Sequence, residues 1–434
     1  MTSPSQSLTH SPIRGRARDI ALAAFIPCPG TLAAEYTDTL KCDEVRPECK
    51  KCIDFGVTCN YDLKIPDLQM VFDRPANNND NDARKVAKKS FLVNPARYGN
   101  GVVEVPAVLT PLISVSDGQS SFDLDHYSLG LLNRFHTRTI LTLGSAKTAS
   151  IYQEVSVREA FAHPYLMHIV LTLTSIHDRY LAPTPSFKPT IKECHHWSQG
   201  ASLLNKKLST PWPPDDRDSL WTAAALLGAV TFCCVEAATP EEAWPLKDSD
   251  HSDLEWLRMS DGKQVIWQMA DPTRPESAFH DLAVELRNDS SHAHNFDFSL
   301  EQVPLQFILL YNLNCESTAE NNPYYESIRY LISLLRMECN HTTIVKYLSF
   351  LSHMGQDFKA LVKQKDPRAL LLVAYWFGRV SHGTWWIAGR ALIEGQSICL
   401  YLERYFPQET TMQELLQFPK MDLGLPMDSV PHLN

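Results

Sequence analysis

Four cysteines near the amino terminus constrain this 434-residue sequence more than any other feature. Cys42, Cys49, Cys52 and Cys59 follow the spacing Cys-x6-Cys-x2-Cys-x6-Cys, so four thiols fall within 18 residues. Thiolate is a ligand that zinc prefers, and a Cys-x2-Cys pair can bind one ion from a single turn. The spacing therefore predicts a zinc-binding module over residues 41–61, with these four cysteines as ligands. The alternative, four ordinary buried cysteines, fits the spacing and the polar surroundings poorly.

The module resembles the second half of the fungal six-cysteine zinc binuclear cluster, the DNA-binding domain of a class of transcription regulators. In that family six cysteines share two zinc ions, and the four cysteines here match the third to the sixth, with Pro47 in the connecting loop. The preceding half is absent, because the first and second cysteines of the pattern fall at Leu32 and Glu35. The resemblance implies zinc as cofactor, DNA as partner and the nucleus as location.

The missing half bears directly on DNA binding. In the family, the helix that enters the major groove lies between the second and third cysteines, and its basic residues contact bases and phosphates. Residues 36–41 of this chain contain one basic residue. Residues 41–61 have a net charge of zero, which suits a phosphate backbone poorly. The basic residues there, which are the candidates for DNA contact, are Lys41, Arg46, Lys50 and Lys51.

Two hypotheses account for the missing half. Either the chain has lost its recognition half and binds a single zinc ion, or the sequence is a mispredicted gene product in which translated intron replaces an exon. We favour the second hypothesis, because a half-cluster that cannot dock on DNA has no obvious use.

Composition limits the remaining function classes. A net charge of −10 indicates that only a small segment contacts nucleic acid, and 44% hydrophobic residues are typical of a globular protein. The seven cysteines outside the module lack framework spacing, which indicates free thiols in a reducing compartment. The longest apolar run, residues 220–235, is 16 residues long, so it predicts a buried helix and no membrane span.

The sequence predicts four segments. Residues 1–40 are irregular and of doubtful origin, residues 41–61 are the partial zinc cluster, and residues 62–120 are a proline-rich disordered linker. Residues 121–434 form an all-helical regulatory domain. The linker carries a basic cluster that is either a nuclear import signal or a solvated segment: Arg84, Lys85, Lys88 and Lys89.

Helical periodicity starts at Phe122 and continues to residue 405. One helix face carries a row of apolar residues, which are Leu166, Ile169, Val170, Leu173 and Ile176. The pattern predicts an all-α domain of about ten helices. Among these, helices are expected over residues 195–208, 218–236, 302–314, 344–363, 367–382 and 384–405, with Asp366-Pro367 opening the fifth.

This helical region also resembles the regulatory domain of the fungal six-cysteine factors, nearest to the sterol-uptake-control regulators. The similar stretches are residues 131–137, 163–168, 195–197 and 366–371. The resemblance implies an effector and dimerisation module that binds a sterol in some members. A homodimer and a sterol or lipid ligand are therefore the expected partners.

Enzymatic motifs are incomplete or missing in the sequence. His195 and His196 begin a stretch that is similar to a His-His-x3-Asp-Gly acyltransferase motif, but Gly200 stands where the acid belongs. Cys194 precedes them, yet consecutive side chains on a helix point about 100° apart and cannot converge on one metal ion. We interpret these residues as helix packing and predict that the chain is not an enzyme.

An aromatic cluster over residues 375–386 has two interpretations. Its members, Tyr375, Trp376, Phe377, Trp385 and Trp386, either line a pocket for an apolar ligand or fill the core of the helical domain. We favour the core, because a helical domain of this size needs large side chains to fill it.

The sequence as a whole predicts a nuclear zinc-cluster transcription factor of fungal type that regulates RNA polymerase II transcription, with DNA binding in doubt. The alternative is a non-DNA-binding helical regulatory or lipid-binding protein with a degenerate single-zinc knuckle.

Overall fold

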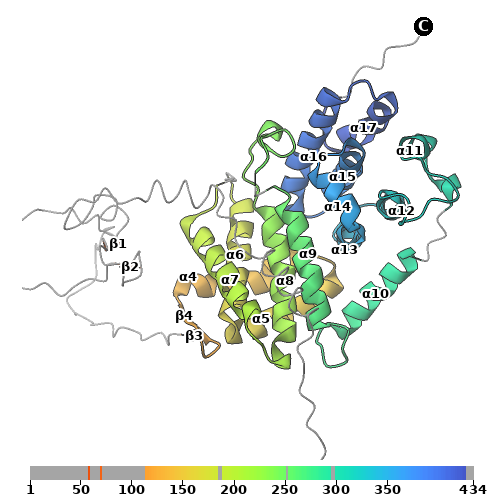
Figure 1. The fold of residues 1–434 in the computed structure, drawn as a ribbon. Coiled ribbons are helices and arrows are strands. Elements are labelled where there is room, and N and C mark those ends of the chain that lie inside the picture. The colour runs from red at the N-terminus through yellow and green to blue at the C-terminus, as the bar shows by residue number, and fades with distance from the viewer. Residues whose placement is uncertain are drawn as a thin grey trace, which may run out of the picture. The chain divides into compact units, whose positions relative to one another are not determined.

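Helices dominate the part of the chain that the structure, a computed structural model, describes (Figure 1). That part is residues 57–58, 69–70, 113–183, 188–250, 253–294 and 299–426. The chain divides into two units, of which residues 29–111 form one and residues 112–434 belong to the other. In the first, β1 (Val57–Thr58) pairs antiparallel with β2 (Gln69–Met70). The second contains fourteen α-helices, α4 to α17, within the described residues, so the prediction that this region is mainly helical is confirmed.

A short hairpin precedes the first of these helices. β3 (Ile113–Ser116) pairs antiparallel with β4 (Ser121–Leu124). In the turn, the Asp117 carboxylate accepts a hydrogen bond from the backbone N–H of Ser120 at 2.7 Å. Gly118 has a φ of 79°, which glycine adopts more readily than other residues. The sequence did not predict this hairpin, which overlaps the end of the expected linker.

A group of helices surrounds α6 (Pro164–Tyr180) in the first half of the helical unit (Figure 1). All its residues from Pro164 to His177 are buried. The predicted apolar face of α6 is confirmed, and its other faces are buried as well because helices pack on several sides of it. The neighbours of α6 are α4 (His126–Arg134), α5 (Ala146–Ala162), α7 (Ile191–Ser209) and α8 (Arg217–Cys233), and α8 packs in turn on α9 (Glu255–Ala270).

Gly200 lets α6 and α7 approach closely. A Cβ atom at this position would lie 3.0 Å from Cγ1 of Ile169 and 3.3 Å from the Ile169 backbone nitrogen. The helices are also joined by an ion pair between Arg179 and the buried Glu193, at 2.8 Å. Helix packing thus accounts for the glycine that stands in place of a catalytic acid.

The apolar run of α8 forms a buried core helix, as predicted. Most side chains from Leu220 to Phe232 are buried, on all sides of the helix. Such a helix is expected where neighbours cover every face. No helix in the described ranges combines the length and apolar character needed to cross a membrane.

The second half of the unit is built around α15 (Pro367–Val380), which begins as the sequence predicts. Pro367 occupies the first turn, and the Asp366 carboxylate accepts a hydrogen bond from the Ala369 N–H at 2.9 Å. The helices that pack on α15 are α12 (Tyr325–Leu334), α13 (Ile344–Ser349), α14 (Gln356–Lys363), α16 (Trp385–Tyr405) and α17 (Thr410–Asp422). The other helices of this half are α10 (His280–His294) and α11 (Leu305–Leu310).

Four predicted helices are confirmed as α7, α8, α15 and α16, whereas two predictions were wrong in extent. The expected helix at 302–314 is only the six-residue α11, which ends just before Asn312 adopts a positive φ of 52°. The expected helix at 344–363 is divided into α13, the 3₁₀ helix η6 (Phe350–His353) and α14. The break falls at Met354 and Gly355, whose backbones are extended.

A buried ion pair within α16 joins this helix to α8 and α9 through its hydrogen bonds. Arg390 of α16 pairs with Glu394 and donates hydrogen bonds to the backbone carbonyls of Thr231 at 2.9 Å and Cys234 at 2.5 Å. The indole N–H of Trp256 donates to the second Glu394 oxygen at 2.9 Å. Both charged side chains are at most 10% exposed, so the pair is shielded from solvent, and the hydrogen bonds of the two terminal guanidinium nitrogens replace bonds to water.

We expect Glu394→Gln to lower the free energy of unfolding by about 3 kcal/mol, because the buried Arg390 guanidinium loses its counter-charge. Denaturant unfolding of the full chain, followed by circular dichroism, measures the change. The matched control is Glu241→Gln, which removes the partner of Arg404 in an ion pair whose two side chains are about half exposed. Equal losses in the two variants would contradict the role assigned to the buried pair.

Candidate functional site: an apolar cavity in the helical unit

The site residues predicted from the cysteine module lie outside the described residues. This holds for the zinc ligands Cys42, Cys49, Cys52 and Cys59, and for the basic residues of the module and the linker. They stay predictions. Within the described residues, no group of three or more metal-ligating side chains could hold a metal ion.

The helical unit contains a cavity of about 720 Å³. Its walls come from α5, α8, α9, α10, α12, α13, η6 and α16, which are spread over more than 230 residues of sequence. Small-molecule sites in proteins have volumes of roughly 300–1,000 Å³ and mainly apolar walls. The aromatic side chains that line this cavity include Tyr152, Trp221, Phe232, Trp256, Trp267 and Phe279.

One row of small residues on α8 leaves the space open. Ala225, Gly228 and Ala229 line the cavity between Trp221 and Phe232, at the spacing of one helix face. A Cβ atom added at Gly228 would meet no other atom within 4 Å. The void therefore depends on the absence of larger side chains along this row.

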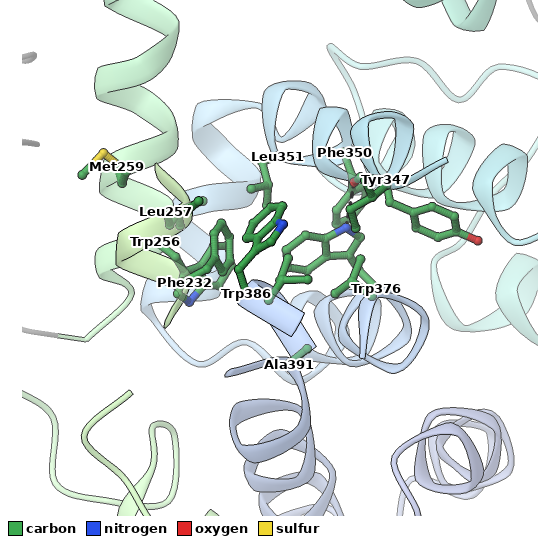
Figure 2. Close-up of a cluster of buried hydrophobic side chains, with 14 of the residues drawn as sticks. Phe232, Trp256, Leu257, Met259, Tyr347, Phe350, Leu351, Trp376, Trp386 and Ala391 are labelled. Atoms are coloured by element: carbon green, nitrogen blue, oxygen red, sulfur yellow. Dashed lines mark hydrogen bonds between the residues drawn. The ribbon is translucent and has the colours of Figure 1, made fainter. Parts of the chain in front are cut away.

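The inner end of the cavity is an aromatic wall contributed by three helices. Figure 2 shows Phe232 of α8, Trp256 of α9 and Trp386 of α16 together. The Phe232 ring centroid lies 6.3 Å from that of Trp256 and 5.9 Å from that of Trp386. Trp376 lies behind this wall, with its ring 5.7 Å from Trp256. These aromatic contacts continue the wall into the core and stabilise it.

The charges of the cavity lining have one sign. Lys263, Arg287 and Lys346 line the cavity, and the lining residues that the structure describes include no carboxylate, histidine or cysteine. Arg287 and Lys346 are exposed, whereas Lys263 is half-buried. Burial lowers the pKa of Lys263 to about 8 and raises the pKa of the Tyr152 phenol. Among the described lining residues, the cavity thus offers mainly apolar walls with one half-buried cation.

Of the aromatic cluster predicted at 375–386, only Trp386 lines the cavity. Tyr375, Trp376 and Phe377 are buried core residues, as the favoured interpretation predicts. Trp385 packs on another part of the domain, where its ring stacks on His177 with centroids 4.3 Å apart. The sequence analysis did not identify the residues of α8 and α9 that line the cavity. On α9 a signal was available, because a lysine, Lys263, shares a helix face with Trp256, Met259 and Trp267.

The histidines singled out in the sequence form a buried pair. Nδ1 of His168 on α6 lies 2.8 Å from Nδ1 of His196 on α7, so one ring donates and the other accepts. Burial lowers the pKa of His168 to about 3 and that of His196 to about 4. Phe122 stacks on His168 at 4.5 Å. The pair is neutral and joins two helices, which agrees with a packing role.

Cys194 also differs from a reactive or metal-binding thiol. Burial raises the pKa of this thiol, which disfavours the thiolate. Its neighbour His195 lies near the buried pair, with its ring centroid 6.1 Å from that of His168. Only one of the two consecutive histidines therefore bonds to His168, as the divergence of neighbouring helical side chains predicts.

Comparison with known proteins adds no family to this picture. No protein-family model matches the chain, and no curated protein matches it.

The histidine pair predicts that acid destabilises the helical unit. Below a pH of about 6.5 these histidines are protonated in the unfolded chain but stay neutral in the folded one. The free energy of unfolding therefore falls as the pH drops toward about 4. We expect His168→Gln to make this decline shallower, by up to about 1.4 kcal/mol per pH unit. Urea unfolding at a series of pH values measures the slopes. His136→Gln, at an exposed position, is the control, and an unchanged slope in His168→Gln would contradict the assignment.

Proposed function

We propose that this chain is a zinc-cluster regulator of transcription whose helical domain binds an apolar small molecule. The cavity of about 720 Å³ carries the ligand-binding part of the proposal. Its volume and its aromatic lining suit a molecule the size of a lipid or a sterol. The regulatory part rests on the cysteine spacing over residues 41–61 and on its resemblance to the fungal zinc-cluster factors.

Ligand binding and regulation fit together physically. A molecule in the cavity contacts helices from both halves of the helical unit, because α5, α8 and α9 meet α12, α13 and α16 around it. A ligand that binds one arrangement of these helices better than another shifts the population toward that arrangement. A regulator can use that shift to change its contacts with a partner.

The alternative proposal is a regulatory protein that binds an apolar ligand and zinc but not DNA. The absence of the family's first two cysteines and the balanced charge of residues 41–61 favour it. Both proposals share the cavity as the ligand site. They differ in zinc stoichiometry and in DNA binding.

Elemental analysis of the full chain tests the zinc module. We expect zinc to be retained through dialysis, and we expect Cys52→Ser to lower the retained zinc because it removes one of four ligands. Cys315→Ser, at an exposed cysteine of the helical unit, is the matched control and should retain the zinc.

The number of zinc ions then separates the two proposals. Two ions per chain with sequence-dependent DNA binding support the DNA-binding regulator, whereas one ion without DNA binding supports the alternative. A chain that retains no zinc contradicts both.

Thermal unfolding of the full chain tests the ligand site. We expect sterols or long-chain lipids to raise the melting temperature by several degrees at saturating concentration, because a ligand that binds only the folded state stabilises it. Gly228→Leu should abolish this shift by filling the cavity, and it should not unfold the chain because space is open beside Gly228.

Gly389→Leu is the matched control for that experiment. Gly389 is a helical glycine with open space around it, but it is exposed on α16 and does not line the cavity. Equal ligand shifts in the wild type and in Gly228→Leu would contradict the assignment of the cavity as the binding site.

A further inference from the structure

Lys263 occupies an unusual place in the cavity wall. It lies on the face of α9 that also carries Trp256, Met259 and Trp267, at spacings of seven, four and four residues. Its ammonium group lies 5.3 Å from the centroid of the Trp221 ring, which packs edge-on against Trp267. The positive charge is therefore placed among aromatic rings inside the cavity.

Two lysines of this unit that are almost fully buried pair with carboxylates. Lys359 pairs with Asp261 at 2.5 Å and Lys420 pairs with Glu403 at 2.6 Å. Lys263, by contrast, makes no hydrogen bond or ion pair with any residue in the ranges that the structure describes. Its ammonium group instead makes a cation–π contact with the Trp221 ring. A charge that is partly removed from water without a counter-charge is unfavourable, so this position suits an anion that the described part of the polypeptide does not supply.

The remaining ionisable groups of the lining do not neutralise it. They are Tyr152 of α5, Arg287 of α10, Tyr330 of α12 and Lys346 of α13, and α8 and α16 contribute none. The Tyr152 phenol is buried and stays neutral at physiological pH, since burial raises its pKa. Arg287 and Lys346 carry the same sign of charge as Lys263 and supply no counter-charge to it.

We propose that the cavity binds a long-chain carboxylic acid, whose carboxylate pairs with the Lys263 ammonium while its tail lies against the aromatic and aliphatic walls. This inference rests on the proposed function, in which the cavity is the ligand site. It replaces the neutral sterol that the family resemblance implies with a singly charged amphiphile. One carboxylate and one ammonium neutralise each other, and the tail fills the apolar volume.

The proposal predicts a pH dependence of affinity. The ammonium form binds the carboxylate, and the pKa of Lys263 in the free protein is about 8. As pH rises above about 8, binding must first recruit a proton to Lys263, so the association constant falls by up to about tenfold per pH unit until the pKa of the complex is reached. A neutral ligand shows no such decline through this group.

Isothermal titration of the full chain with palmitic acid, hexadecanol and methyl palmitate tests the proposal. We expect the acid to bind most tightly at pH 7, and Lys263→Met to weaken acid binding roughly 10- to 100-fold while leaving the alcohol and the ester within about threefold. The decline of acid binding above pH 8 should disappear in Lys263→Met. Lys263→Arg should retain acid binding, because it keeps the positive charge.

Lys346→Met is the matched control, since it removes an exposed lysine of the same lining and should change acid binding by less than about threefold. Unchanged circular dichroism of each variant establishes that the fold is retained. Equal affinity of the wild type for the acid, the alcohol and the ester, or undiminished acid binding by Lys263→Met, overturns the carboxylate assignment but leaves an apolar ligand site in place. Failure of all three compounds and of sterols to bind overturns the proposed function as well.

Discussion

The buried ion pair of Arg390 and Glu394 holds α8, α9 and α16 together through its hydrogen bonds. One of the residues that it contacts, Trp256, is part of the cavity wall. Arg390 binds the backbone carbonyls at the end of α8, and Glu394 binds the indole of Trp256 at the start of α9. The same Trp256, together with Phe232 and Trp386, closes the inner end of the cavity (Figure 2). If these helices slide, Arg390 loses its hydrogen bonds to the carbonyls at the end of α8 and Glu394 loses the one from the Trp256 indole. Both charges would then stay buried with fewer partners, so the junction tolerates little displacement. An open volume next to such a junction can persist without collapse.

A void in a protein interior normally costs stability, since interiors are close-packed and the atoms around a gap lose dispersion contacts. In this helical unit the gap is lined by small residues on α8 and by large aromatic residues on α9. Lys263, which has no hydrogen-bond or ion-pair partner among the described residues, adds a second cost in the same place. Both costs are offset if a ligand with an apolar tail and a negative head group occupies the cavity. Binding then stabilises the fold and changes how its two halves are held together.

The sequence could predict the long helices, because their patterns depend on neighbours along the chain. The Asp366-Pro367 start of α15 and the apolar run of α8 are local signals, and both are confirmed. The predicted extents of the helices at 302–314 and 344–363 were wrong. The apolar periodicity continues past Asn312 and Gly355, but the backbone leaves the helical conformation at these residues. The cavity could not be predicted, since a row of apolar residues on a helix has the same sequence pattern whether it packs on other side chains or lines a cavity. Lys263 in such a row was the available signal, but its surroundings are set by residues far away in sequence.

The central claim is that the helical unit holds a small molecule in the cavity beside Lys263. Native mass spectrometry of the full chain, titrated with a long-chain carboxylic acid, tests it most directly. We predict a complex of one acid per chain that survives transfer to the gas phase and is lost on denaturation. The Gly228→Leu variant should not form this complex. A chain whose mass is unchanged at saturating acid and at saturating sterol, while it stays folded, would contradict the account.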